Sequence, residues 1–251
     1  KTRNAQRTGF GRFEGMTQRM EEASKVGGRA DWRDNLTWYT HETIFARLIK
    51  FGGELIFSPL AQVELVSFER IPTTGACILA VNHISNWDVV YMGLCSPRHP
   101  HFMAKVELYI NPVFGAAIRW YGSFPVHRGE NDAWALRQAG RVLEAGQLLC
   151  MFPEGTRSKG KAQLRRGKVG VVRLALDYHA PVVPIAISGT HDFRFRGWKG
   201  NKIRIEAGQP LDFVALNGSS TYDHDTLREL TSVLMRQIAA MLPPANRGIY
   251  A

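Results

Sequence analysis

Short, almost wholly apolar runs alternate with amphipathic segments along most of the chain. Three of these runs are Cys77–Val81, Leu148–Phe152 and Val182–Ile187. Apolar runs this short are typical of strands that are covered on both faces of a sheet. The pattern predicts strands at Gln62–Phe68, Ala76–Val81, His101–Lys105, Ser123–His127, Leu148–Phe152, Val182–Ser188 and Lys202–Glu206.

Helical periodicity occurs between these runs. It predicts helices at Trp87–Cys95, Val113–Trp120, Asp132–Ala145, Lys168–Tyr178 and Thr226–Leu242. Because strands and helices alternate, we expect an α/β fold, a single domain with a largely parallel central sheet flanked by helices. In such sheets ligands bind at the carboxyl ends of the strands, so polar residues that follow a strand are the first candidates for a site.

The first 58 residues have a different pattern. Residues 1–35 are polar and contain several glycines, which indicates a mobile arm with one short helix near Met16–Ser24. From Leu36 to Phe57 apolar residues recur at helical spacing, which predicts an amphipathic N-terminal helix that could break at Gly52-Gly53. We therefore divide the chain into an arm (1–35), an amphipathic helical segment (36–58) and the α/β domain (59–251).

The apolar stripe of this predicted helix has two interpretations. It can pack on the sheet, as such stripes commonly do, or its aromatic residues can enter the headgroup–acyl boundary of a membrane. The sequence leaves the two open. No transmembrane span or signal peptide is visible, so any membrane contact is expected to be peripheral.

Charge narrows the choice of partner. The chain of 251 residues has 32 Lys and Arg against 22 Asp and Glu, a formal net charge of +10. Such an excess suggests an anionic partner: a nucleic acid, an anionic membrane surface or a phosphorylated substrate. The three widely spaced cysteines, Cys77, Cys95 and Cys150, match no zinc pattern and are expected to be buried, reduced thiols in a cytosolic protein.

Two ionisable side chains, His83 and Asp88, follow the predicted strand Ala76–Val81. One interpretation is structural, because Ser85-Asn86-Trp87-Asp88 fits a capping box at the start of the next helix. The other is catalytic. If His83 lies in the loop before that helix, Asp88 can accept its Nδ1–H and leave Nε2 free as a base for a substrate hydroxyl.

A second motif follows the strand Leu148–Phe152. Residues 152–158 read FPEGTRS, and together with NHISNWD at 82–88 they resemble the glycerolphosphate acyltransferase superfamily, most closely its 1-acylglycerol-3-phosphate acyltransferase branch. Further blocks that look like those of the family are Lys105–Leu108, Pro112, Gly122–Arg128 and Val183–Ala186. Ordered blocks over roughly residues 60–190 make a strong signal, whereas any one of them alone would be weak.

The resemblance implies transfer of a fatty acyl group from acyl-CoA or acyl carrier protein to the free hydroxyl of 1-acylglycerol 3-phosphate, which gives phosphatidate. His83 would be the general base and Asp88 its orienting partner, and no metal or further cofactor is implied. Residues expected to bind the acceptor or its phosphate are Lys105, Arg128, Glu154, Gly155, Thr156 and Arg157. Glu154 is expected to hold Arg157 or the glycerol backbone. A lysophospholipid acceptor implies a peripheral protein on the cytoplasmic face of a membrane.

Several alternatives stay open at this stage. The acceptor could instead be glycerol 3-phosphate or another lysophospholipid, although the intact FPEGTRS favours the first assignment. Lys105 and Arg128 could be solvated strand ends, and the basic run from Arg157 to Lys168 either a solvated face or a loop that meets anionic headgroups or an acyl carrier protein.

Two rival interpretations are weaker. A nucleic-acid-binding or membrane-binding module without catalysis would also explain the charge, but no nucleic-acid-binding signature occurs. His99 and His101 flank Pro100 and suggest a metal, yet no Asp, Glu or Cys stands close by in sequence to complete the ligand set.

Overall fold

The computed structural model describes residues 31–128, 132–158, 162–194 and 200–251. Seven strands form one sheet in the order β1-β7-β6-β2-β5-β3-β4, and all neighbours are parallel except β6 and β7. The strands are β1 (Ala61–Val66), β2 (Cys77–Val81), β3 (Pro100–Lys105), β4 (Phe124–Val126), β5 (Leu148–Met151), β6 (Val182–Ser188) and β7 (Asn201–Ala207). The predicted strands and the largely parallel sheet are confirmed.

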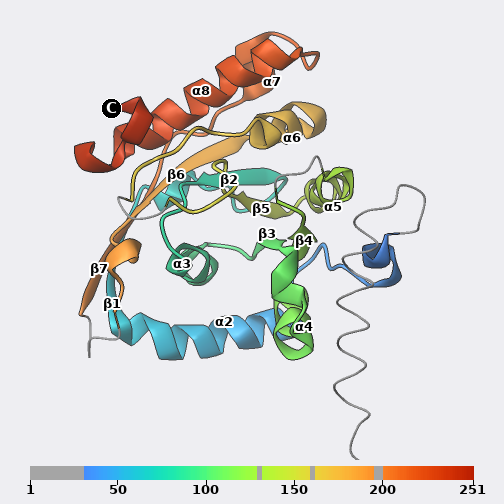
Figure 1. Ribbon diagram of the computed structural model, residues 1–251, viewed down its shortest axis with the longest axis vertical. Coiled ribbons are helices and arrows are strands. Elements are labelled where there is room, and N and C mark those ends of the chain that lie inside the picture. The colour runs from blue at the N-terminus through green and yellow to red at the C-terminus, as the bar shows by residue number, and fades with distance from the viewer. Residues whose placement is uncertain (1–30, 129–131, 159–161, 195–199) are drawn as a thin grey trace, which may run out of the picture.

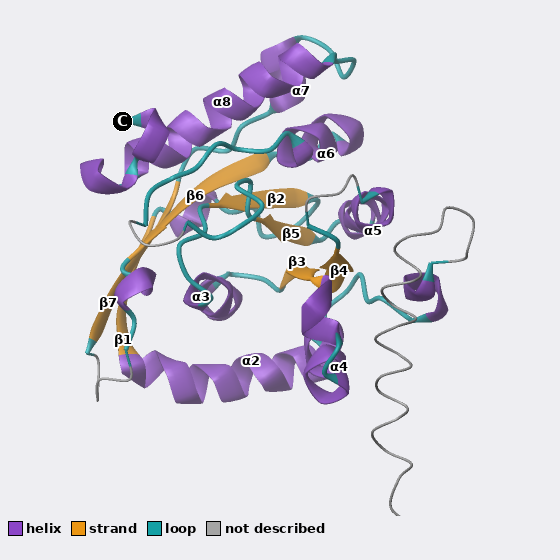
Figure 2. Ribbon diagram, viewed as in Figure 1, coloured by secondary structure: helices purple, strands orange, loops and turns teal. Residues whose placement is uncertain are grey.

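Helices lie on both sides of this sheet (Figures 1 and 2). They are α2 (Ile44–Phe57), α3 (Trp87–Cys95), α4 (Pro112–Trp120), α5 (Ala133–Glu144), α6 (Gly170–Tyr178), α7 (Phe213–Asn217) and α8 (His224–Met241). Helices α5, α6 and α8 cover one face, and α3 packs against the other. The predicted helices are present, while the short α7 was not predicted.

The alternation of side chains along the strands explains this layering. In β2, Ile78 and Ala80 join the cluster under α5, α6 and α8, whereas Cys77, Leu79 and Val81 join the cluster under α3. Every β2 residue is therefore buried. Cys77 and Cys150 are buried free thiols, as predicted, and Cys95 is a half-buried one.

Helix α2 begins at Ile44 and not at Leu36, which corrects the prediction. The Thr43 hydroxyl accepts the Ala46 N–H and caps the first turn. The helix then runs unbroken through Gly52-Gly53. A Cβ at Gly53 would stand 3.0 Å from Leu94 of α3, so glycine lets the two helices approach closely.

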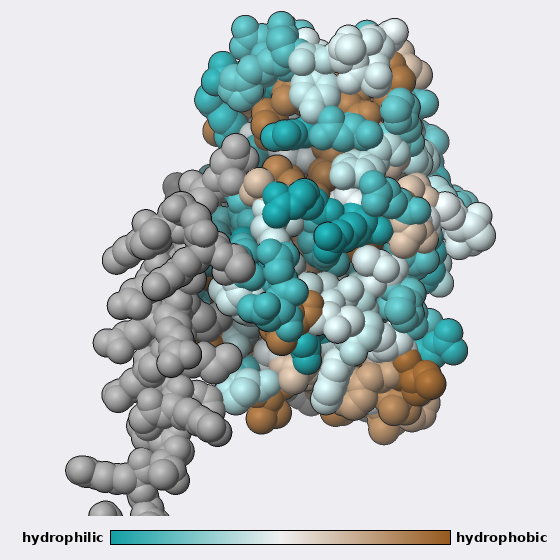
Figure 3. Space-filling model, turned by 90° about the vertical axis from the view of Figure 1, so that its right-hand side faces the viewer, coloured by the Kyte–Doolittle hydropathy of each residue, from teal (hydrophilic) through white to brown (hydrophobic). Residues whose placement is uncertain are grey.

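Most of the large apolar side chains of α2 are exposed. Ile44, Leu48, Phe51 and Leu55 lie on one face of the helix and are 61% to 79% exposed. Helix α4 adds further exposed apolar residues, Val113 and Phe114. Figure 3 shows hydrophobic side chains gathered at this lower end of the molecule, where α2 and α4 lie. The stripe does not pack on the sheet. Across the ranges that the structure describes, no helix combines the length and hydropathy that a membrane span requires.

Residues 31–35, which composition assigned to the polar arm, are docked on the body. Arg33 is buried, pairs with Asp31 and Asp132 at 2.6 Å each, and lies over the ring of Trp134. Asp132 also accepts the N–H of His127, so this contact braces the end of β4. The helix expected near Met16–Ser24 lies outside the described residues.

Candidate active site

The two sequence motifs meet because they leave neighbouring parallel strands at the same edge of the sheet. β2 ends at Val81 and β5 ends at Met151, and the two strands pair directly. Asn82 extends the β2–β6 pairing past the strand end through reciprocal hydrogen bonds with the backbone of Ile187. The loop that follows therefore starts from a fixed position.

The carboxylate of Asp88 serves both the capping box and the histidine. Its Oδ2 accepts the N–H groups of Ile84 and Ser85 and lies 2.8 Å from His83 Nδ1. Of the predicted capping box only the bond from Ser85 N–H to Asp88 forms, because Ser85 Oγ accepts the N–H of Trp87 and the helix begins after Asn86. The contact of Asp88 with His83 has the geometry that the catalytic interpretation requires, and the catalytic role itself stays a prediction. A carboxylate only accepts hydrogen bonds, so Nδ1 carries the hydrogen and Nε2 of the neutral imidazole holds the lone pair.

The side chain of His83 is buried and packs against Phe152. Its ring stacks on Phe152 with centroids 4.0 Å apart and an angle of 22° between the planes. The side chain is 4% exposed, and in the part of the chain that the structure describes Nε2 has no hydrogen-bond partner. The backbone oxygen of His83 accepts the N–H of Ser158, which ties the two motif loops together.

Glu154 joins the motifs more directly. Oε1 accepts the N–H of His83 at 2.8 Å and Oε2 accepts the N–H of Arg165 at 2.9 Å. Burial raises the pKa of Glu154 to about 7, while these two backbone donors act in the opposite direction. Both oxygens are therefore engaged within the protein rather than with Arg157. Contact of Glu154 with the acceptor stays a prediction.

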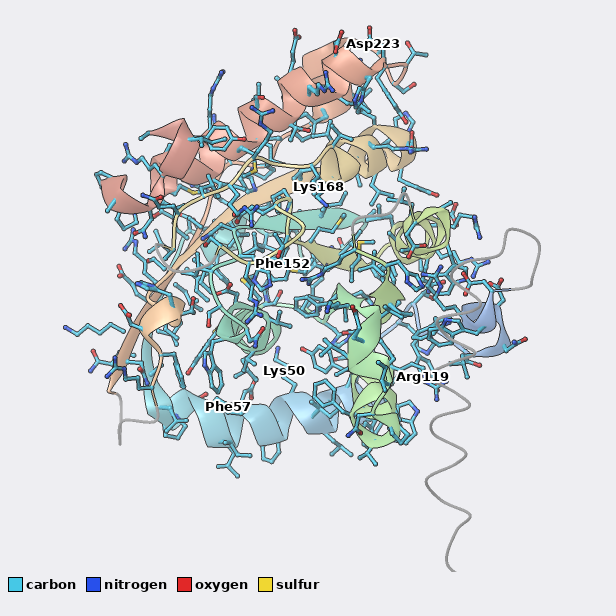
Figure 4. All side chains as sticks on the ribbon, in the orientation of Figure 1. Lys50, Phe57, Arg119, Phe152, Lys168 and Asp223 are labelled. Atoms are coloured by element: carbon cyan, nitrogen blue, oxygen red, sulfur yellow. The ribbon has the colours of Figure 1, made fainter. Side chains whose placement is uncertain are left out.

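A pocket of about 170 Å³ opens beside Phe152. Arg128, Gly155 and Lys168 line it together with apolar side chains, which are Met103, Val126, Leu136, Met151 and Val171. Gly155 has φ of +68°, and the Lys168 side chain packs where a Cβ would lie. Figure 4 shows Phe152 and Lys168 in the central region above α3. Lys168 was not among the predicted site residues, because only the fold brings the segment before α6 to the turn at Gly155.

The predicted phosphate-binding cations gather near the pocket. Shielding from solvent and the charge of Arg157 both lower the pKa of Arg128, whereas Glu107 acts to raise it. Lys105 Nζ lies 2.8 Å from Glu107 Oε1. Lys105 and Arg128 thus both lie near the Glu107 carboxylate, and Arg157 lies near Arg128, so positive charge exceeds negative charge here. Thr156 is half-buried in the same turn as Arg157.

The loop that carries Arg165 and Lys168 is held by the C-terminal segment. Leu164 N–H donates to the backbone oxygen of Asn246, and Gly167 N–H donates to the Tyr250 hydroxyl. These contacts join segments far apart in sequence, and no local pattern signals them.

His99 and His101 lie away from this site and are buried. His101 Nδ1 is 3.0 Å from the backbone oxygen of Gly122, and burial lowers the pKa of His101 to about 4. Among the residues whose structure is described, no group of three or more His, Cys, Asp or Glu side chains is arranged to hold a metal ion.

The fold and the two motif loops define the class of protein, an acyltransferase. A family model described as Acyltransferase matches residues 62–188. The 1-acyl-sn-glycerol-3-phosphate acyltransferase of Bacillus subtilis (strain 168) is 30% identical over 168 residues, which cover 65% of this chain and 82% of the relative. The chain belongs to the 1-acyl-sn-glycerol-3-phosphate acyltransferase family and is an enzyme, as the resemblance implied.

Other relatives are longer. The enzymes of the same name from Streptococcus pneumoniae (strain ATCC BAA-255 / R6) and from the chloroplast of Brassica napus, the latter called BAT2, are 34% and 28% identical. The aligned parts cover 63% and 65% of this chain but only 59% and 49% of those relatives. The crystal structure of the 1-acyl-sn-glycerophosphate (LPA) acyltransferase PlsC from Thermotoga maritima superimposes with a TM-score of 0.59 at 22% identity, covering 91% of this chain and 94% of that one. This likeness supports the fold.

Proposed function

We propose that the protein transfers a fatty acyl group from acyl-CoA or acyl carrier protein to the free hydroxyl of 1-acylglycerol 3-phosphate, giving phosphatidate. The observation that carries the proposal is the contact of 2.8 Å between His83 Nδ1 and Asp88 Oδ2. This contact orients the imidazole so that Nε2 is the basic atom. The imidazole stacks on Phe152, which lines the pocket together with Arg128 and Lys168. The names of the relatives support the same acceptor.

In this mechanism Nε2 of His83 takes the proton from the acceptor hydroxyl while its oxygen attacks the thioester carbonyl. The tetrahedral intermediate collapses with cleavage of the C–S bond, and the imidazolium returns the proton to the departing thiolate. Asp88 keeps the ring in the required tautomer and stabilises its charged form. The thioester is already activated, so the scheme needs no further cofactor.

The acceptor phosphate fits the cationic cluster. Burial and, after it, repulsion from Arg157 lower the pKa of Arg128, and a phosphate dianion between the two arginines would relieve that repulsion. Lys168 also lines the pocket beside Arg128 and adds to the positive charge. The charged headgroup would then lie at the mouth of the pocket and the reacting hydroxyl near Phe152 and His83.

We infer that the exposed apolar face of α2 and α4 meets the membrane that holds the acceptor. The inner face of α2 is small at Gly53, where it packs on α3, and the large side chains of Ile44, Leu48, Phe51 and Leu55 are exposed on the outer face. A soluble surface gains nothing from such a face, whereas an interfacial helix buries it at the headgroup–acyl boundary. The unpaired cysteines fit a reducing compartment, so we propose a peripheral position on the cytoplasmic face.

Thiol release from acyl-CoA and from acylated carrier protein tests the function. The panel of acceptors is 1-acylglycerol 3-phosphate in vesicles, glycerol 3-phosphate and a lysophospholipid without a terminal phosphate. We expect release that depends on 1-acylglycerol 3-phosphate, with phosphatidate as the product by mass. Faster release with another acceptor, or release that needs no acceptor, would refute the assignment.

A further inference from the structure

Thr190 touches the catalytic carboxylate from a part of the chain that neither motif contains. It opens the 3-10 turn Thr190–Asp192 after β6, and it is fully buried. Its hydroxyl donates to Oδ1 of Asp88, which is 102 residues away in sequence. The contact is therefore a product of the fold.

The two oxygens of Asp88 have different surroundings. Oδ2 is shared by the ring of His83 and two N–H groups of its own loop, those of Ile84 and Ser85. In the described ranges Thr190 is the donor to Oδ1. A buried carboxylate oxygen without a donor is costly, so the carboxylate of a variant without this hydroxyl would turn to find one. Any such turn moves Oδ2 away from Nδ1.

The backbone fixes Thr190 in this position. Gly189 has φ of +86°, and a Cβ there would collide with the backbone oxygen of Lys202 in β7. Near the end of β6, the backbone of Ile187 exchanges two hydrogen bonds with the Asn82 side chain. The strand end that carries Thr190 is thereby tied to the strand end that carries His83.

We propose that Thr190 is a positioning residue for acyl transfer, whose hydroxyl holds the plane of the Asp88 carboxylate so that Oδ2 faces His83 Nδ1. This inference rests on the proposed role of His83 as the base. A positioning residue acts on the chemical step, so its loss lowers kcat and leaves the KM values of both substrates nearly unchanged.

Thr190→Val and Thr190→Ser test it by thiol release from acyl-CoA with 1-acylglycerol 3-phosphate. Valine keeps the shape and removes the donor, and we expect kcat to fall about tenfold with both KM values within about twofold of the parent. Serine keeps the donor and restores most of kcat. Parent-like kcat in Thr190→Val, or equal losses in both variants, would overturn the proposal. If Thr190→Val does not fold, Thr190→Ala against Thr190→Ser makes the same contrast.

A second readout does not depend on the substrate. The proton signal of His83 Nδ1–H, assigned by its absence in His83→Ala, reports the hydrogen bond to Asp88. We expect it to weaken or move upfield in Thr190→Val and to be retained in Thr190→Ser; an unchanged signal in the valine variant would count against the proposal. An inactive parent with the expected signals would refute the proposed function and leave this contact standing.

Discussion

The backbone N–H of His83 donates to Oε1 of Glu154 across 2.8 Å, although the two residues are 71 positions apart. The second oxygen of Glu154 accepts the N–H of Arg165 in the loop that follows. One buried carboxylate thus joins the loop of the histidine, the FPEGTRS turn and the loop that leads to Lys168. Glu154 therefore has a structural role in joining these segments, whereas its predicted contact with the acceptor stays a prediction.

Glu154→Gln tests that link. The amide can accept only one of the two N–H groups, and its own NH2 faces the other, so we expect a loss of roughly 1–3 kcal/mol in the free energy of unfolding. Urea unfolding at about pH 4.5 measures it, because the raised pKa of Glu154 has not yet lowered the stability of the parent there. Gln163→Glu, at an exposed position, also exchanges an amide and a carboxylate and is the control. Unchanged stability in Glu154→Gln would contradict the role of Glu154 as a tether.

The same variant tests the titration of Glu154. Its pKa is raised by burial from 4.5 to about 7 in the folded protein, so the folded state binds a proton that the unfolded chain releases. The stability from this group is present below about pH 4.5 and is lost as the pH rises through about 7. Relative to Glu154→Gln, the parent should lose stability between these two pH values, by up to about 3 kcal/mol. Parallel stability curves for the two proteins would contradict the raised pKa.

Removal of the base should stop acyl transfer. We expect His83→Ala to lower kcat at least 100-fold, on the order of what positioned proton removal contributes, with little change in the thermal midpoint. Asp88→Asn should also lower kcat. An amide has one accepting oxygen where the carboxylate has two, and its NH2 group would face donors that now bind a carboxylate oxygen. Thiol release measures both variants. Retained turnover in His83→Ala would remove the mechanism.

Arg128→Ala should weaken binding of the acceptor more than that of the donor. Loss of a charged contact to phosphate predicts an increase of about tenfold in the KM for 1-acylglycerol 3-phosphate. Arg228→Ala on α8 removes one exposed positive charge far from the site and serves as the control. Equal changes in the two KM values would argue against a phosphate contact.

Charge on the apolar face of α2 should release the protein from membranes. Leu48 and Phe51 are 61% and 69% exposed, so Leu48→Glu and Phe51→Glu disturb no core. We expect sedimentation with anionic vesicles to fall about tenfold for each. Leu216→Glu is the matched control, since Leu216 is 56% exposed on α7 at the opposite end of the molecule (Figure 1). A similar loss in the control would show that charge alone causes the effect.

Local patterns were sufficient for the strands, most of the helices and the two motif loops. An apolar run such as Cys77–Val81 has one stable environment, between two layers, so its burial could be predicted without a fold. The start of α2 could not be placed as well. Apolar residues continue upstream to Leu36 at helical spacing, but Thr43 caps the amino end of the helix, which therefore begins at Ile44.

The sequence by itself determined the class of fold and the spacing of His83 and Asp88, because each depends on residues that are close in the chain. The tertiary structure alone decided which groups complete the site. Thr190, Lys168 and the partners of Glu154 come from separate strand ends and loops, and the outward turn of the α2 stripe depends on how closely Gly53 packs on α3. Contacts between distant segments follow from the order of strands in the sheet, which no local periodicity encodes.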